Sequence, residues 1–215
     1  EQPRVVEGHL NLAQAHALNK EYEMAADVLE RAMEKLPEAD VLMMALARVQ
    51  LAAGEKAVAV KTLEAALEKN PANQGGWMIL GNLHERDKEF EKAARVYARA
   101  FENNPEMWPA ANNYAFIKSA FSAGTDDDLD KAMAMARKAE QLNPEAGVIQ
   151  DTIGWIYFQM GDLDQAYAHV QKALAQMPDN SSINYHMGMI LHSQGKVSEA
   201  KLYFERALIS DKEFL

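Results

Sequence analysis

A repeat of 34 residues, lengthened once to 39, runs through the chain of 215 residues. Five prolines are separated by 34, 34, 39 and 34 residues: Pro37, Pro71, Pro105, Pro144 and Pro178. An alanine recurs with matching intervals, and a second alanine follows each one after seven residues. The two sets are Ala25, Ala59, Ala93, Ala132, Ala166 and Ala200, and Ala32, Ala66, Ala100, Ala139, Ala173 and Ala207. Several residue types that keep one period over the full length indicate a tandem-repeat fold.

The alanine spacing predicts helices. Residues seven apart lie on one stripe of an α-helix, so each pair marks a face with almost no side chain. A large residue followed by a small one marks the facing stripe of the preceding helix: Leu12-Ala13, Leu46-Ala47, Leu80-Gly81, Tyr114-Ala115, Ile153-Gly154 and Met187-Gly188. Small residues on both stripes let two backbones approach closely. The residues expected to fill the space beside them are Leu12, Leu29, Leu80 and Tyr97. Each repeat is therefore predicted to be a helical hairpin, and the stacked hairpins an all-α solenoid.

Two repeats resemble the tetratricopeptide repeat (TPR), as found in bacterial proteins, almost position for position. The matching residues are Trp77, Leu80-Gly81, His84, Phe90, Ala93, Tyr97, Ala100 and Pro105 in one, and Ile153-Gly154, Tyr157, Gly161, Ala166, Ala173 and Pro178 in the other. The resemblance implies one array over residues 1–215, wound as a right-handed superhelix of about six hairpins. The repeats are 6–39, 40–73, 74–107, 108–146, 147–180 and 181–214.

The fourth repeat is five residues longer than the others, and the extra residues lie between 116 and 131. We expect a first helix extended to about Ser122, a loop around Gly124, and a second helix capped by Thr125 to Asp128. The longer repeat is either a tolerated insertion or a local kink that contacts a partner.

Composition excludes several classes of function. The chain has 22 basic and 32 acidic residues, a formal net charge of −10, which repels phosphate backbones and so argues against nucleic acid as a partner. No apolar run approaches the ~18 residues of a membrane helix. Cysteine is absent, which removes thiolate chemistry but does not distinguish a cytoplasmic from a periplasmic protein.

Motifs for catalysis or metal binding are missing from the sequence. The acidic run from Asp126 to Asp130 has Lys131 where a calcium-binding EF-hand loop needs glycine, and Arg137 where it needs glutamate. The six histidines contain no pair with zinc-ligand spacing, and no phosphate-binding glycine loop follows a strand. We therefore predict a protein that is not an enzyme and that needs no cofactor or metal.

The resemblance also implies where a partner would bind, because TPR arrays usually hold partners on the concave face made by the first helix of each repeat. The residues at those positions are Asn11, Gln14, Met44, Arg48, Met78, Asn82, Asn112, Asn113, Phe116, Asp151, Trp155, Phe158, Tyr185 and Met189. Only Arg48 is a clear cation among them, so the carboxylate clamp of chaperone-linked TPR proteins is not reproduced.

Two subsets of these residues allow alternative interpretations. The asparagines either hydrogen-bond a partner's backbone, as in the partly similar asparagine ladder of O-linked GlcNAc transferases, or serve as caps and local helix contacts. Phe116, Trp155 and Tyr185 are either a binding hot spot or packing between repeats.

The predicted function is a non-catalytic adaptor that holds a peptide or protein segment in its concave groove. In its overall sequence the chain resembles bacterial TPR proteins of pilus, secretion and exopolysaccharide or exosortase systems. The alternatives are a structural module that forms homo-oligomers through its end faces, or the TPR region of a larger enzyme. Because no polar capping helix follows the sixth hairpin, we expect an excised segment of a longer protein.

Overall fold

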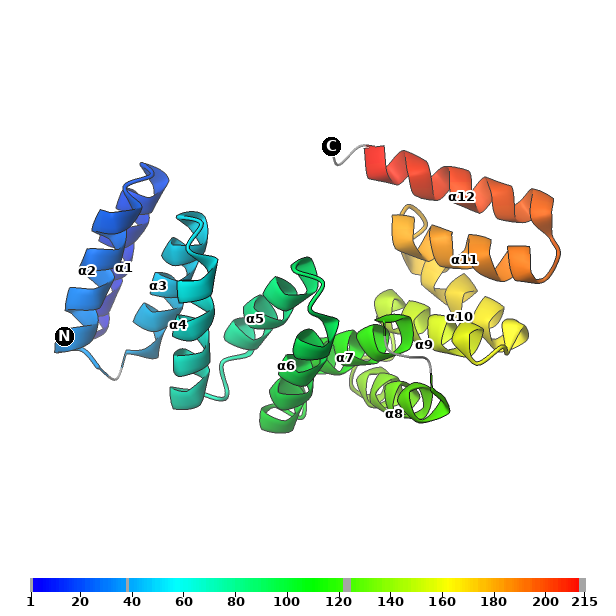
Figure 1. Ribbon diagram of the computed structural model, residues 1–215, viewed down its shortest axis with the longest axis horizontal. Helices are drawn as coiled ribbons and strands as arrows, with labels where there is room; N and C mark the ends of the chain where they lie inside the picture. Colours follow the sequence, from blue (N-terminus) through cyan, green and yellow to red (C-terminus); the bar gives the residue numbers. More distant parts are fainter. Residues whose placement is uncertain (1, 38, 122–124, 213–215) are drawn as a thin grey trace. The chain divides into compact units, whose positions relative to one another are not determined.

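The computed structural model describes residues 2–37, 39–121 and 125–212, and twelve helices make up the regular structure of these residues (Figure 1). They divide into two compact units, residues 1–83 and 84–215. The first unit contains α1 (Gln2–Leu18), α2 (Tyr22–Lys35), α3 (Asp40–Ala52), α4 (Lys56–Lys69) and most of α5 (Gln74–Arg86). The second unit contains the end of α5, then α6 (Phe90–Asn103), α7 (Trp108–Phe121), α8 (Asp126–Leu142), α9 (Gly147–Gln159), α10 (Leu163–Gln176), α11 (Ser181–Ser193) and α12 (Val197–Lys212).

Helices that follow one another in sequence pack as antiparallel hairpins, and the alanine register forms the seams between them. Eleven of the twelve periodic alanines are at most 2% exposed, while Ala207 on α12 is partly exposed. In the first unit Ala25 and Ala32 form a core with Leu29, Leu42 and Leu46. The predicted all-helical hairpin fold is therefore confirmed. No helix in the described ranges has both the length and the apolar character to cross a bilayer.

Two glycines show how closely the paired helices approach. A Cβ placed on Gly154 of α9 would lie 2.6 Å from Val170 Cγ2 and 3.1 Å from the backbone oxygen of Ala166, both on α10. A Cβ on Gly188 of α11 would lie 2.5 Å from the ring of Phe204 on α12. Both glycines are the small members predicted from the sequence. A methyl group at Gly154 would meet backbone atoms of α10, whereas a methyl group at Gly188 would require the Phe204 ring to shift.

Five of the hairpin turns use one backbone conformation. Gly54, Gly161 and Gly195 have φ between 79° and 84°, and Lys20 and Lys88 have φ of 63° and 60°. In each turn the next residue donates its backbone N–H to a carbonyl five residues earlier, as Glu55 does to Gln50. This is the Schellman arrangement that ends a helix on a left-handed residue. A Cβ on any of these three glycines would meet nothing within 4 Å, so the backbone conformation alone favours glycine there.

The longer fourth repeat accommodates its extra residues in several places. Compared with α3 and α4, α7 is one residue longer, α8 is three residues longer, and the connection between α7 and α8 is one residue longer. Thr125 caps α8, because its side chain accepts a hydrogen bond from the Asp128 backbone N–H, as predicted. The loop expected around Gly124 lies outside the described residues.

One packing expectation is wrong. Leu12 is 49% exposed and does not fill the space beside the alanine seam. The seam of the first hairpin is instead filled by Leu29, which is fully buried on α2. Leu12 lies on a side of α1 that no described helix covers, whereas its counterparts Leu46, Leu80, Ile153 and Met187 are all buried.

Candidate functional site

All fourteen predicted partner-binding residues lie on the first helix of a hairpin, which means on α1, α3, α5, α7, α9 or α11. They separate into a group in the first unit and a group in the second unit.

The first unit has a hollow of about 460 Å³ between α1 and α3. Three predicted residues line it and are exposed: Asn11 and Gln14 from α1, and Arg48 from α3. The rest of its wall is apolar or small, with Leu10, Ala13, Ala17, Leu29, Ala45, Val49 and Ala52. Asn11, Gln14 and Arg48 form no hydrogen bond or ion pair with the rest of the described chain. The hollow therefore combines an apolar floor with three polar groups that are available to a ligand.

The other predicted residues of the first unit differ in accessibility. Met44 is buried and its sulfur lies against Gly76 of α5. Met78 is half-buried and Asn82 is exposed. Met44 therefore contributes mainly to packing between α3 and α5.

In the second unit the predicted aromatic residues belong to one continuous cluster. The Trp155 ring of α9 stacks against Phe158, with ring centroids 5.0 Å apart, and against His186 of α11, at 4.2 Å. Phe116 of α7 contacts the same His186 ring at 6.2 Å. Trp155 is only 8% exposed, and its Nε1 makes no hydrogen bond within the described chain. Little of this ring is therefore accessible to a partner.

A buried carboxyl group, that of Asp151, contacts this cluster through His186. His186 Nδ1 lies 2.8 Å from Asp151 Oδ1 and 3.0 Å from Asp151 Oδ2, and both side chains are buried. The contact fixes the imidazole that stacks on Trp155. Its members are 35 residues apart, and although Asp151 was among the predicted inner-helix residues, its contact with His186 was not predicted.

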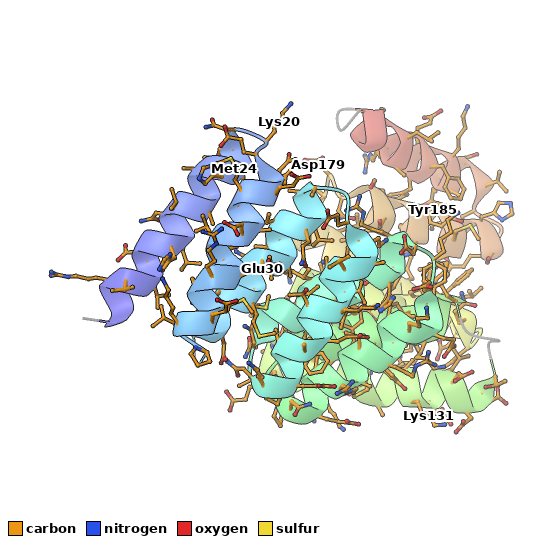
Figure 2. The ribbon with its side chains drawn as sticks, turned by 60° about the vertical axis from the view of Figure 1, so that its left-hand side comes forward. Lys20, Met24, Glu30, Lys131, Asp179 and Tyr185 are labelled. Atoms are coloured by element: carbon orange, nitrogen blue, oxygen red, sulfur yellow. The ribbon has the colours of Figure 1, made fainter. Side chains whose placement is uncertain are left out.

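Tyr185 is the accessible member of the aromatic group, since it is 46% exposed (Figure 2). Its ring lies 6.0 Å from those of His186 and Phe204, and it lines a hollow of about 290 Å³ with Ser181, Ser182, Ala207 and Leu208. Met189, one turn further along α11, is half-buried. Within this cluster Tyr185 is the side chain best placed to contact another molecule.

The two asparagines of α7, Asn112 and Asn113, differ in their burial and in their hydrogen bonds. Asn112 is buried, and its Oδ1 accepts no hydrogen bond from any described residue. Asn113 is half-buried and hydrogen-bonds the hydroxyl of Tyr97 on α6. Burial and the neighbouring Glu85 raise the pKa of Tyr97 well above its ordinary value, so this hydroxyl stays protonated. Asn113 therefore makes a local helix contact, one of the two interpretations that the sequence allows.

The acidic run at the start of α8 is occupied by ion pairs within the chain. Asp128 lies 3.1 Å from Lys118 Nζ on α7, and Asp127 pairs with Lys131 one turn later. Lys118 also reaches Glu91 on α6. Over the residues that the structure describes, no group of three or more histidine and carboxylate side chains could hold a metal ion.

A polar network that sequence reasoning missed connects α8, α9 and α10. Arg137 donates to Glu140 at 2.7 Å and to the Tyr157 hydroxyl at 3.0 Å. Gln150 donates to Glu140 at 2.9 Å, and its Oε1 lies 2.8 Å from Nδ1 of the buried His169. Burial, and then the charges of Lys172 and Arg137, lower the pKa of His169. No periodic pattern marks these residues, so the sequence carried no signal for the network.

Comparison with known proteins agrees with this architecture. Two tetratricopeptide-repeat family models match the chain, over residues 44–107 and 157–213. No curated protein matches it. Among solved structures, a tetratricopeptide repeat protein from Parabacteroides merdae is 17% identical, with a TM-score of 0.74 over 95% of this chain and 79% of that one.

Two further structures share the fold. A structure of MamA is 18% identical, with a TM-score of 0.61 over 78% of this chain and 95% of that one. A thermophilic TPR protein from Thermus thermophilus is 27% identical, with a TM-score of 0.53 over 86% of this chain and 98% of that one. From the two matched segments and the shared architecture of sequential hairpins, the chain belongs to the tetratricopeptide-repeat family, whose members are generally protein-interaction modules.

Proposed function

We propose that the protein is a non-catalytic adaptor that binds a peptide or protein segment on the first helices of its hairpins. The observation that carries this proposal is the hollow between α1 and α3, where Asn11, Gln14 and Arg48 are exposed and without partners in the described chain. An apolar side chain of the partner would fill the floor beside Ala13 and Ala45. The two amides would hydrogen-bond the partner's backbone, and Arg48 would pair with a carboxylate.

The rest of the chain supports a protein partner over other classes. The net charge of −10 disfavours nucleic acid, and the TPR family is typically non-catalytic. Bacterial pilus, secretion and exopolysaccharide systems are the setting in which the sequence resemblance predicts such an adaptor.

Selection from a displayed library of random linear peptides tests the proposal. The enriched peptides are then titrated against the protein by fluorescence anisotropy. We expect the double variant Asn11→Ala/Arg48→Ala to weaken binding by about tenfold or more, because it removes a hydrogen bond and a charge-assisted contact. Lys61→Ala is the matched control, because Lys61 is exposed on the second helix α4. Failure to enrich any peptide, or binding that is insensitive to the double variant, contradicts the proposal.

A second candidate function is self-association. On α12, Leu202, Leu208 and Ile209 are 56%, 65% and 62% exposed, an unusual apolar content for a solvent-facing helix surface. Size-exclusion chromatography across protein concentrations, with the variant Leu202→Glu on the exposed face of α12 and outside the hollow beside Tyr185, distinguishes the candidates. Self-association predicts a larger species that the variant abolishes, whereas the adaptor proposal predicts no effect of this variant on peptide binding.

A further inference from the structure

The first unit contains a second hollow, of about 640 Å³, outside the set of residues that the sequence pointed to. Its walls are the turn before α2, the part of α2 from Tyr22 to Glu30, the last turn of α3 and the turn before α4. The residues that line it are Lys20, Glu21, Tyr22, Glu23, Met24, Ala26, Asp27, Glu30, Val49, Gln50, Ala53 and Glu55. Figure 2 shows Lys20 and Met24 near the turn of the first hairpin and Glu30 further along α2. Of these residues only Val49 also lines the hollow between α1 and α3.

The charge of this hollow is strongly negative. Five carboxylates line it against one cation, Lys20. Two of the carboxylates are already engaged, since Glu21 lies 2.6 Å from His16 and Asp27 lies 2.8 Å from Arg31. The other three, Glu23, Glu30 and Glu55, are exposed and form no ion pair with the rest of the described chain. Three free carboxylates around one depression favour a cationic ligand.

A second observation also points to a ligand that donates hydrogen bonds. Gln50 lines the same hollow, is only 6% exposed, and its Oε1 has no hydrogen-bond partner among the described residues. A buried acceptor without a partner costs free energy that a bound donor would recover. Gln50 lies in the last turn of α3, where the helix end carries partial negative charge. The opposing positive end of α2 is offset by Glu23 in its first turn.

The apolar part of the wall selects among cations. Tyr22 is half-buried and Met24 is exposed, and together with Ala26 and Ala53 they give an apolar surface beside the carboxylates. A long aliphatic stem with a charged end group matches this combination. A guanidinium group presents several donors in a plane, can bridge two carboxylates, and can stack on a tyrosine ring, whereas an ammonium group is a strongly hydrated point charge.

We infer that this hollow between α2 and the end of α3 binds an arginine side chain of a partner protein. The inference goes beyond the proposed groove function, because it concerns a different wall of the unit and a partner segment of the opposite charge from the one that Arg48 would favour.

Titration of the protein with the acetylated and amidated peptide Gly-Gly-Arg-Gly-Gly, followed by amide chemical shifts in NMR spectra, tests the inference. Saturable shifts are expected for Glu23, Glu30 and Gln50. The matching lysine peptide should bind about threefold more weakly, and the citrulline peptide, which has the shape of arginine without its charge, should give no saturable shift. Equal binding of the citrulline peptide, or of spermidine, would overturn the inference, because either result removes the role of the charged planar group.

Variants of exposed residues keep the test independent of folding. Glu30→Gln should weaken the arginine peptide about threefold, and the triple variant Glu23→Gln/Glu30→Gln/Glu55→Gln about tenfold. Glu34→Gln, exposed on the same helix and outside the hollow, is the matched control. Lys20→Gly removes the one cation of the wall and should tighten binding about twofold, a gain that unfolding cannot produce. Unchanged affinity in both the triple variant and Lys20→Gly would refute the site, and neither result depends on Asn11 or Arg48.

Discussion

His186 on α11 holds Asp151 on α9 at 2.8 Å, and this single buried contact connects two inner helices that are 35 residues apart in sequence. The imidazole also stacks on Trp155 at 4.2 Å and contacts Phe116 at 6.2 Å. The His186–Asp151 contact and the aromatic cluster of the second unit therefore share the His186 ring, so replacing either residue should perturb both.

Replacing Asp151 by alanine is expected to destabilise the protein by about 3 kcal/mol, because it leaves His186 buried without its partner. The measurement is urea unfolding followed by circular dichroism. Glu205→Ala is the control: Glu205 pairs with Lys201 at 3.7 Å on the exposed surface of α12, and its loss should cost under about 0.5 kcal/mol. A double-mutant cycle of Asp151→Ala and His186→Ala should give a coupling above about 1 kcal/mol. Additive effects would show that the contact contributes nothing specific.

Gly154→Ala should destabilise the protein by about 2 kcal/mol, since the new methyl group meets the Ala166 carbonyl oxygen and the Val170 amide nitrogen, each at 3.1 Å. Backbone atoms cannot move aside as a flexible side chain can. Thermal unfolding measures the effect. Gly8→Ala on α1 is the control, because its Cβ meets nothing within 4 Å, and it should stabilise the chain by up to about 1 kcal/mol. Equal effects of both variants would argue against close approach of α9 and α10.

Lys88→Gly is expected to raise stability by about 1 kcal/mol, because Lys88 has a φ of 60° that glycine adopts without steric cost. The reverse exchange, Gly161→Lys, should lower stability by a similar amount, although the site has room for a side chain. Urea midpoints of the two variants, compared at equal slope, give both numbers. The two variants should change the free energy of unfolding in opposite directions, and a change in the same direction would contradict the prediction.

The buried His169 makes stability depend on pH. Burial, and then Lys172 and Arg137, lower its pKa in the folded protein, while the unfolded chain titrates near 6.5. Below about pH 6.5 the unfolded state therefore binds more protons, so stability falls as the pH drops from 7 toward 5 and is unaffected by this group above pH 7.

The variant His169→Gln can still donate to Gln150 but does not titrate, and it should flatten the pH dependence of the unfolding midpoint over this range. His192→Gln, on the exposed side of α11, should leave the dependence unchanged. A slope that survives in His169→Gln would assign it to other groups, such as Glu140 in the same network.

The alanine spacing predicted the fold well, because small residues along one stripe of a helix determine how closely a neighbouring helix can approach. Ala166 and Ala173, for example, are both fully buried in the core that α10 forms with α11 and α12. Leu12 shows the limit of this reasoning, because a repeat pattern gives the phase of a residue but not which side of the helix is covered.

The site was predictable only in part. The pattern placed Asn11, Gln14 and Arg48 on inner helices, and the structure brings them to one hollow. It could not predict the Asp151–His186 contact, because that contact depends on how the hairpins stack. The acidic hollow is formed by α2 and the end of α3, and the repeat pattern of this sequence did not mark its lining residues.

The common backbone of the turns at Lys20, Gly54, Lys88, Gly161 and Gly195 has an engineering consequence. A chain cut at one of these positions and rejoined at another would meet the same left-handed turn conformation on both sides of the junction. These turns are therefore suitable crossover points, at which hairpins can be duplicated, deleted or exchanged with those of relatives. Arrays of new length can then be assembled while these turns are kept.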